Sequence, residues 1–415
     1  MTAPVQIDAS YAARIAFLVE LAEHLHGYGT TAQRLEDAMI SVSRRLGLEC
    51  EPWSNPTGMI LTFSDPQRPP GDSDTTRVIR RAPGDNDLYR LSEADRIAEE
   101  VMAGRLGIAD GHAALRALDR PPTRSARLLQ AAGFGLAAAS LAGLLRLPWL
   151  DIVTAGAIGL MVGLLDLLAQ RRPRLREGSD AVAAIVAGSV AVCVAAWVAP
   201  LNLNTVVITS MIVLMPGLSL TNAVSELTSQ HLVAGTARFS GAVTTLLKLT
   251  IGVMIALTLA QLLGIEPQVR ALRPQPPWVE WASVLFAAFA FAVLFRAGRR
   301  DYLLVMAAAV TGYSVSRFAG EAWGGPVGVF LSALVVTVAG NGYARWMKRP
   351  GALVRVPGII MLVPGSVSLR SVLTLVQQQD VGAGQATAMA VLNVLLALIG
   401  GMLIGNLLLP ARRAL

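Results

Sequence analysis

The sequence contains little charge, few cysteines and almost no lysine. Only 15% of its 415 residues are charged and 53% are hydrophobic, whereas soluble domains carry about 25% charged residues. This deficit argues against a soluble enzyme, and the composition excludes a disordered, collagen-like or disulfide-rich secreted chain. Cys50 lies in a polar region and Cys193 in an apolar one, so we expect no disulfide, and no metal-ligand spacing is present.

Charge is distributed unevenly along the chain. Residues 1–127 hold 18 acidic and 15 basic side chains, whereas residues 128–415 hold 10 acidic and 20 basic ones. The first part has the composition of a soluble domain, and in the second part short basic clusters separate apolar segments. That arrangement is typical of membrane-protein loops, so the basic net charge does not indicate nucleic-acid binding. The N-terminus shows no cleavable signal peptide.

The polar region, residues 1–125, is predicted to be a small α+β cytoplasmic domain. Hydrophobic periodicity and turn residues indicate two helices, three short strands and two further helices, at 9–26, 31–47, 49–53, 58–64, 76–82, 92–105 and 110–119. The domain has no nucleophile elbow, phosphate-binding glycine loop or metal-binding histidine pair. We therefore expect a regulatory or gating role and assign no catalytic residue.

The remaining chain is predicted to be an α-helical integral membrane protein with ten transmembrane helices. Each apolar segment can cross roughly 30 Å of hydrocarbon. The segments are 128–147, 150–169, 180–199, 203–224, 235–263, 278–296, 301–316, 325–343, 354–376 and 384–409. With the N-terminal domain cytoplasmic, the inner flanks carry 16 basic residues and the outer flanks 5. The positive-inside rule thus predicts that both termini are cytoplasmic.

Two apolar segments share an unusual core, which indicates an internal repeat. Residues 212–222 and 360–370 each place Pro-Gly after an aliphatic run. We interpret the membrane region as two five-helix halves, 126–265 and 278–410; the odd helix number makes the second half inverted. Inverted repeats are a recurrent plan of secondary transporters. The alternative is chance, because transmembrane helices tolerate both residues.

Several short motifs carry a family resemblance over nearly the whole chain. They are Gly27–Glu36, Pro56–Gly58, Met215–Gly217 with Asn222, Arg355–Gly358 and Leu362–Gly365. With these residues the sequence resembles the threonine/serine exporter family of bacterial inner-membrane proteins. The resemblance implies a cytoplasmic domain followed by ten helices, and export of small amino acids driven by the proton gradient. A related system split over two chains is implicated in dicarboxylate export, and the fused chain favours the amino-acid branch.

The two Pro-Gly steps are the predicted substrate-binding elements. A proline–glycine break frees backbone groups, and the helix that follows directs its positive dipole end at the gap. Such an end suits a substrate carboxylate, and nearby hydroxyl and amide groups suit a hydroxyl side chain. We expect both breaks to face one shared cavity; alternatively, they are kinks whose hydroxyls satisfy their own backbone. The residues are Pro216, Gly217, Ser219, Thr221, Asn222, Pro364, Gly365, Ser366 and Ser368.

Ionisable and amide side chains inside apolar segments are further candidates. Lys248 is one of only two lysines and could bind a carboxylate or relay a proton, or it could snorkel to an interface if its helix is long and tilted. Glu226 and Asp166 are candidates for proton coupling, although Asp166 could equally form a local ion pair. Asn393 is either cavity-lining or part of a helix–helix contact.

The leading hypothesis is a secondary-active, proton-coupled exporter of threonine or serine in the bacterial inner (plasma) membrane. The alternatives are an exporter of dicarboxylates such as succinate, a membrane protein whose soluble domain is enzymatic, and a passive channel or scaffold. The expected partners are a small-molecule substrate, protons and the lipid bilayer. We expect no nucleic acid, metal or cofactor, and the oligomeric state stays open, a homo-oligomer included.

Overall fold

The N-terminal domain is built on a three-stranded antiparallel sheet. In the computed structural model, β1 (Glu49–Asn55), β2 (Gly58–Ser64) and β3 (Thr75–Arg80) lie in the order β1-β2-β3. Four helices accompany the sheet: α1 (Tyr11–Gly27), α2 (Ala32–Arg45), α3 (Leu88–Met102) and α4 (Ile108–Ala117). The structure describes residues 9–69, 74–82, 84–270, 273–363, 365–378 and 381–410.

Alternation in β2 creates the core of this domain. Leu61 and Phe63 are fully buried, together with Phe17 of α1 and Met39 of α2. A buried face of this kind stabilises a small sheet that would be marginal alone. The small α+β region predicted from the sequence is therefore confirmed, although α3 begins at Leu88 rather than near residue 92. The reason is local: the Asp87 carboxylate accepts a hydrogen bond from the Arg90 N–H at 2.9 Å and caps the helix.

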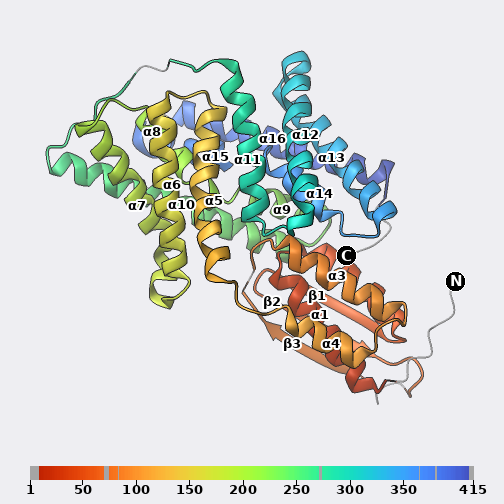
Figure 1. The fold of residues 1–415 in the computed structure, drawn as a ribbon. Coiled ribbons are helices and arrows are strands. Elements are labelled where there is room, and N and C mark those ends of the chain that lie inside the picture. The colour runs from red at the N-terminus through yellow and green to blue at the C-terminus, as the bar shows by residue number, and fades with distance from the viewer. Residues whose placement is uncertain are drawn as a thin grey trace.

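Long apolar helices make up the rest of the molecule (Figure 1). Nine helical segments in the described part of the chain can span a membrane by length and composition, and a bent pair raises the number to ten if it is counted as one span. The helices of this region, with α8 and α9 forming the bent pair and α14 and α15 forming one span, are α5 (Arg124–Leu144), α6 (Trp149–Ala169), α7 (Pro173–Trp197), α8 (Leu203–Ser210), α9 (Gly217–Thr228), α10 (Leu232–Leu262), α11 (Pro277–Leu294), α12 (Tyr302–Trp323), α13 (Gly325–Met347), α14 (Ala352–Ile360), α15 (Gly365–Gln378) and α16 (Val381–Leu408).

The predicted apolar segments match these helices, with two corrections: α7 begins at Pro173 rather than near residue 180, and one helix ends later than predicted. The seventh helix, α12, continues to Trp323 instead of ending near residue 316. Its last turns contain Arg317 and Glu321, which ended the apolar segment in the sequence. In the structure these two side chains pair with each other, and Arg317 also pairs with Glu280. The helix can therefore continue without leaving either charge unpaired.

Small residues bring the membrane helices close together. A Cβ added at Gly159 of α6 would lie 2.9 Å from the Phe134 carbonyl oxygen of α5. A Cβ added at Gly163 would lie 2.9 Å from the Ala131 carbonyl oxygen of the same helix. Lipid is as apolar as a leucine side chain, so close backbone approach is a main source of helix association in a bilayer. These glycines allow α5 and α6 to pack closely.

The two Pro-Gly breaks lie in contact, although they are far apart in sequence. The first break separates α8 from α9, and the paired helices bend by 56°. The second separates α14 from α15, and its Pro364 lies outside the described residues. A Cβ added at Gly217 would lie 3.1 Å from the Gly365 Cα. The two breaks therefore lie beside each other, and the expectation that both face one shared cavity stays a prediction.

The N-terminal domain sits against one end of the helix bundle, and the C-terminal end lies beside it (Figure 1). Backbone bonds fix the junction: the Leu88 N–H donates to the Phe295 carbonyl at 2.9 Å. Arg349 donates to both carboxylate oxygens of Asp301, at 2.6 and 2.9 Å, and to the Ser92 hydroxyl of α3 at 3.1 Å. The domain and the bundle thus form a shared polar interface.

Candidate functional site

A cavity of about 560 Å³ lies between the N-terminal domain and the adjoining end of the bundle. Residues of α2 and α3 line one side, and residues of α9, α14 and α16 line the other. Its volume is in the range of small-molecule sites. The polar and charged lining residues include Thr30, Gln33, Arg34, Asp37, Glu99, Thr221, Asn222, Ser225, Arg355 and Asn406.

Arg355 is the most unusual of these residues. It is only 9% exposed, and its Nε atom has no hydrogen-bond partner in the described part of the chain. Its methylene stem packs on α13, where a Cβ added at Gly340 would lie 2.8 Å from Cγ. A buried guanidinium without a full set of acceptors is costly. Such a group binds a carboxylate strongly, because its planar fork matches the two oxygens.

A second arginine reaches the cavity from the N-terminal domain. Arg34 of α2 is half-buried, and desolvation lowers its pKa to about 10 while the nearby Asp37 carboxylate opposes that shift. It therefore stays cationic at neutral pH. The Thr30 hydroxyl just before α2 is also buried without a hydrogen-bond partner among the described residues. The motif Gly27–Glu36 thus forms part of the cavity wall.

Helix α9 brings two predicted substrate residues to the cavity. Thr221 and Asn222 both line it, one turn after the first break. The Thr221 hydroxyl donates to the Gly217 carbonyl at 3.2 Å, as the backbone-satisfying alternative anticipated, but its oxygen can still accept a bond. The lining does not include Ser219, Ser366 or Ser368.

Lys248 and the other intramembrane candidates lie elsewhere. The Lys248 Nζ donates to the Glu177 carbonyl at 3.0 Å and lies 3.8 Å from an oxygen of Asp180, both in the first turns of α7. Its side chain is 39% exposed, which favours the snorkelling alternative. Asp166 accepts a hydrogen bond from Gln170 near the end of α6, and Asn393 is exposed on α16.

Glu226 joins the bundle to the N-terminal domain. Its carboxylate is 1% exposed and accepts two hydrogen bonds from Arg238 of α10, each of 2.9 Å. It also accepts the Ala32 backbone N–H at 3.0 Å, in the first turn of α2. A carboxylate at a helix N-terminus is stabilised by the unsatisfied N–H groups and the dipole there. A residue after the first break thus caps a helix of the other domain.

A second contact reinforces this junction. The Glu36 carboxylate of α2 lies 3.1 Å from the His231 Nε2 atom, at the start of α10. Its other oxygen accepts bonds from the Ser54 N–H and hydroxyl of β1, at 2.7 and 2.9 Å. Glu36 therefore connects the sheet, α2 and the bundle.

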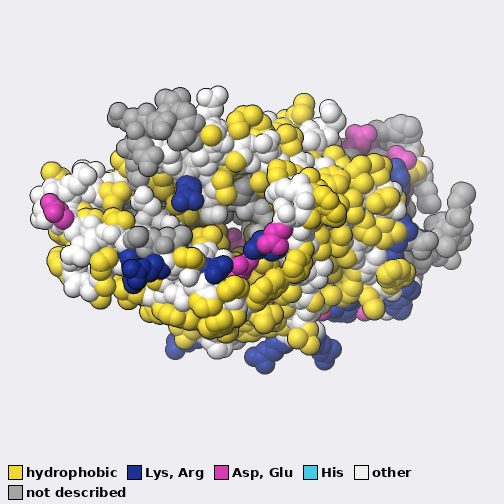
Figure 2. All heavy atoms as spheres, turned by 90° about the horizontal axis from the view of Figure 1, so that it is seen from above, with side chains coloured by type: hydrophobic (Ala, Val, Ile, Leu, Met, Phe, Trp, Pro, Cys, Tyr) yellow, Lys and Arg dark blue, Asp and Glu magenta, His cyan; other side chains and the backbone are white. Residues whose placement is uncertain are grey.

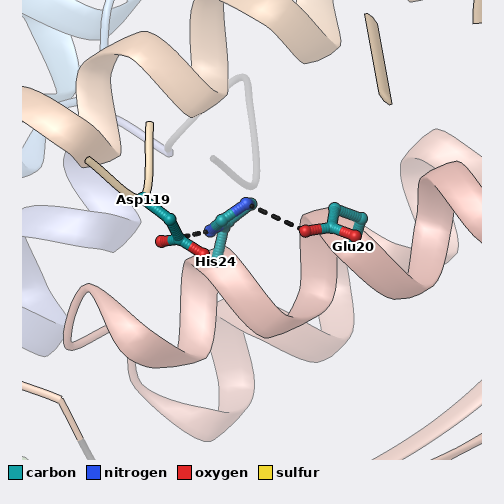
Figure 3. Close-up of side chains that lie close together, drawn as sticks. All are labelled: Glu20, His24 and Asp119. Carbon is teal, nitrogen blue, oxygen red and sulfur yellow. Dashed lines mark ion pairs between the residues drawn. The ribbon is translucent and has the colours of Figure 1, made fainter. Parts of the chain in front are cut away.

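Within the N-terminal domain, Glu20, His24 and Asp119 form the one group with metal-ligand proximity among the described residues. The two carboxylates approach different ring nitrogens: Glu20 lies 3.3 Å from Nε2 and Asp119 lies 3.6 Å from Nδ1 (Figure 3). Nδ1 also lies 3.0 Å from the Tyr28 hydroxyl. One ion bound by a single ring nitrogen could not use this arrangement well. We interpret the group as a buried histidine between two carboxylates.

Four site residues have a role that the sequence analysis did not assign: Arg34, Arg238, Arg355 and Asn406. Two of them lay within quoted motifs, Arg34 in Gly27–Glu36 and Arg355 in Arg355–Gly358. Arg238 had counted only as an inner flanking charge. For Arg355, the available signal was its place in a short motif that also contains Pro-Gly.

The fold and the cavity define a multi-pass helical membrane protein with a solute-sized site next to its soluble domain. Two family models match the sequence: one described as "Putative threonine/serine exporter" over residues 16–260, and one described as "Threonine/Serine exporter, ThrE" over residues 280–408. The chain belongs to this threonine/serine exporter family.

Curated relatives come from fungi. The chain is 23% identical to pheromone-regulated membrane protein 10 of Eremothecium gossypii, over 87% of this chain and 49% of the relative. The protein of the same name from Kluyveromyces lactis is 24% identical, over 92% of this chain and 39% of the relative. The chain thus spans about half or less of the length of these relatives. No solved structure matches the sequence.

Proposed function

We propose that this chain is a secondary-active exporter of threonine, serine or a similar small amino acid, which it loads from the cavity beside the N-terminal domain. The observation that carries the proposal is Arg355, a buried guanidinium with a partnerless Nε in a cavity of about 560 Å³. The family description supports the substrate class. Arg355 binds the substrate carboxylate in this proposal.

The charges of the cavity favour an amino acid over a dicarboxylate. Two arginines, Arg34 and Arg355, share the lining with two acidic residues, Asp37 and Glu99. A zwitterion needs both signs, whereas a dicarboxylate would be repelled by the acidic side chains. Thr221 and Asn222 supply hydrogen-bonding groups for a hydroxyl side chain.

Proton coupling and inverted symmetry are further parts of the proposal. Reciprocal packing supports the symmetry: α9 of the first half contacts α16 of the second, and α15 contacts α10. Among the proton-coupling candidates, Glu226 is the best placed, because it joins α9 to the N-terminal domain. None of the three candidates, Glu226 included, is among the residues that line the cavity. We place both termini on the cytoplasmic side of a bacterial plasma membrane, following the basic flanks.

Flux through proteoliposomes tests this function. The purified chain is reconstituted, and efflux of labelled threonine, serine and succinate is measured with and without a pH gradient. We expect threonine or serine flux that the gradient accelerates. Flux of succinate alone would assign the chain to dicarboxylate export, and gradient-independent flux would remove proton coupling. Absence of flux for all three solutes would contradict the proposal.

A further inference from the structure

A second hollow opens on the face of the bundle away from the N-terminal domain. It has a volume of about 300 Å³ and is lined by Tyr313, Ser316, Arg317, Gly320 and Glu321 of α12, and by Met361 and Leu362 after α14. Figure 2 shows acidic and basic side chains gathered about a hollow near the middle of this face, with broad hydrophobic surface beside them. Charge in that position is costly unless water or a solute reaches it.

The two hollows approach each other on opposite sides of one short segment. Ile359 lines the cavity beside the N-terminal domain, whereas Met361 and Leu362 line the second hollow, which we call the outer pocket. Helix α14 ends between them at Ile360, and the Leu362 N–H donates to the Ile359 carbonyl at 2.8 Å. Less than one helical turn of chain therefore separates a residue of one hollow from a residue of the other.

Packing holds the body of α14 in place, whereas the segment after it is packed unevenly: Leu362 is buried among residues of α13 and α16, and Met361 is not. A Cβ added at Gly312 of α12 would lie 3.2 Å from the Gly358 Cα, so the two backbones touch. The Gly312 carbonyl also accepts a 2.6 Å hydrogen bond from the Ser332 hydroxyl of α13. Beyond Ile360 the chain leaves the helix, and Met361 is only half-buried. A movement of the Met361 side chain would therefore disturb less packing than a movement of α14.

The arginines of the two hollows differ in their partners. Arg317 donates from Nε to Glu280 at 2.9 Å and also pairs with Glu321 through Nη1. Tyr313 donates its hydroxyl to the same Glu280 oxygen at 2.6 Å. Arg355, by contrast, keeps an unpartnered Nε. A carboxylate arriving at Arg317 competes with two carboxylates of the protein, so the outer pocket binds it more weakly than Arg355 does.

We propose that the outer pocket is the release site for the exported solute. Residues 359–362 form the partition between the loading cavity and this release site. Arg317 receives the solute carboxylate on the release side. This inference rests on the proposed export function. Strong binding at Arg355 and weak binding at Arg317 favour loading on one side and release on the other. The different partners of the two arginines thus ease loading at low solute concentration and release on the other side, while the solute and proton gradients set the net direction of flux.

Cysteine labelling tests the partition without any flux measurement. In a full chain carrying Cys50→Ala and Cys193→Ala, Val356→Cys and Met361→Cys are made separately; both positions are half-buried, and they line different hollows. A membrane-impermeant thiol reagent is applied to vesicles of each orientation. Exposed reference positions report the two sides: Ser125→Cys beside the N-terminal domain and Glu266→Cys in the loop after α10.

We expect Val356→Cys to react only from the side of Ser125→Cys, and Met361→Cys only from the side of Glu266→Cys. Reaction of both from one side, or absence of reaction at Met361→Cys, would overturn the partition. The flux assay is separate: this labelling pattern without any threonine, serine or succinate flux would retain the partition and reject the export function.

The role of Arg317 has its own test. Threonine added on the outer side should slow labelling of Met361→Cys, and Arg317→Gln should raise the threonine concentration needed by about tenfold, as expected for loss of a charge-assisted bond. Arg317→Lys should keep part of the protection. Equal protection in Arg317→Gln, or none in the parent, would reject Arg317 as the receiving group.

Discussion

Arg355 and Arg34 reach one cavity from segments that are more than three hundred residues apart. Arg355 lies in α14 and Arg34 in α2, on opposite sides of the domain junction. A lone buried arginine would be destabilising, because folding removes its hydration without supplying acceptors. Residues kept at such a cost commonly serve a ligand. In the proposed function, the solute carboxylate supplies acceptors that Arg355 does not find among the described residues.

The first prediction concerns the carboxylate anchor. Arg355→Gln removes a charge-assisted pair with the solute, which is worth about 1.5–3 kcal/mol, so the Michaelis constant for threonine efflux should rise at least about tenfold. Arg355→Lys keeps the charge but loses the planar fork and should restore only part of the affinity. The matched control is the exposed Arg300→Gln, which should leave efflux unchanged. An unaltered constant in Arg355→Gln would contradict the assignment.

The second prediction concerns Lys248. Its ammonium group contacts the start of α7 and is 39% exposed, so we expect Lys248→Met to retain threonine efflux within about twofold of the parent. Stability should fall by no more than about 1 kcal/mol, because exposed ion pairs contribute little. Both quantities can be measured on the same purified protein, by efflux and by thermal unfolding. A tenfold loss of efflux in a stable variant would return Lys248 to the transport pathway.

At the scale of elements, the molecule is organised around two interrupted helices. The sequence predicted the interruptions because proline removes a donor and glycine removes a side chain. The structure adds that these interruptions touch, with Gly217 against Gly365. Small residues were needed at both positions, because backbone contact at this distance leaves no room for Cβ atoms. Each half therefore limits how the other can move.

The third prediction follows from that contact. A Cβ at Gly217 would overlap the Val363 side chain and lie 3.1 Å from the Gly365 Cα. We expect Gly217→Ala to cost about 1–3 kcal/mol of stability and to slow efflux about tenfold. Gly241→Ala in α10 is the control, because no atom lies within 4 Å of its added Cβ. Similar efflux and melting temperatures for the two variants would show that the contact is unimportant.

The fourth prediction concerns α1 and pH. Burial lowers the pKa of both His24 and His26 below the ordinary value of 6.5, although Asp119 and Glu20 partly oppose this for His24. The unfolded histidines then bind protons more readily, so stability is fully present above about pH 6.5 and is lost as the pH falls. Hydrogen exchange in α1, corrected for its intrinsic pH dependence, should show weaker protection at pH 5.5 than at pH 7.5. If the double variant His24→Gln/His26→Gln lost the same amount of protection between pH 7.5 and pH 5.5, the pH effect would belong to other groups.

At the scale of the whole molecule, the N-terminal domain contacts the bundle and also forms one wall of the cavity. Its motif Gly27–Glu36 contributes Thr30 and Arg34 to the lining, and it meets the bundle through Glu226 and His231. A gating role, expected from the absence of a catalytic motif, fits this position. In the proposed function, solute passes the edge of this domain to enter the cavity, which predicts that docking and transport are coupled.

The fifth prediction tests that coupling. Glu226→Ala leaves Arg238 without its buried partner and removes the cap on α2, which should cost about 3 kcal/mol. We expect faster hydrogen exchange in the first turn of α2 and slower threonine efflux. The double variant Glu226→Ala/Arg238→Met removes both charges and should recover part of the stability. Unchanged exchange in α2 would mean that Glu226 does not hold the domain.

Sequence and structure agree most closely where local physics decides the outcome. Ten apolar segments, the α+β character of the first 125 residues and the positions of the two breaks follow from hydrophobicity, periodicity and Pro-Gly chemistry. The predicted end of α12, near residue 316, was wrong. From the sequence alone, Arg317 is expected in the outer flank, and only the structure reveals its partner Glu280 on another helix. Lys248 shows the same limit, since its surroundings depend on the 31-residue length of α10 and on where α7 begins.

The sequence by itself determined that this chain crosses a membrane, that two of its spans are broken, and that its family is one of exporters. Tertiary structure alone decided which charges are paired. Glu226 pairs with Arg238 and the α2 N-terminus, Arg317 pairs with two carboxylates, and the Arg355 Nε has no partner within the described ranges. The reason is physical: hydropathy depends on each residue and its neighbours in the chain, whereas the electrostatic free energy of a buried charge depends on groups that only folding brings within a few ångströms.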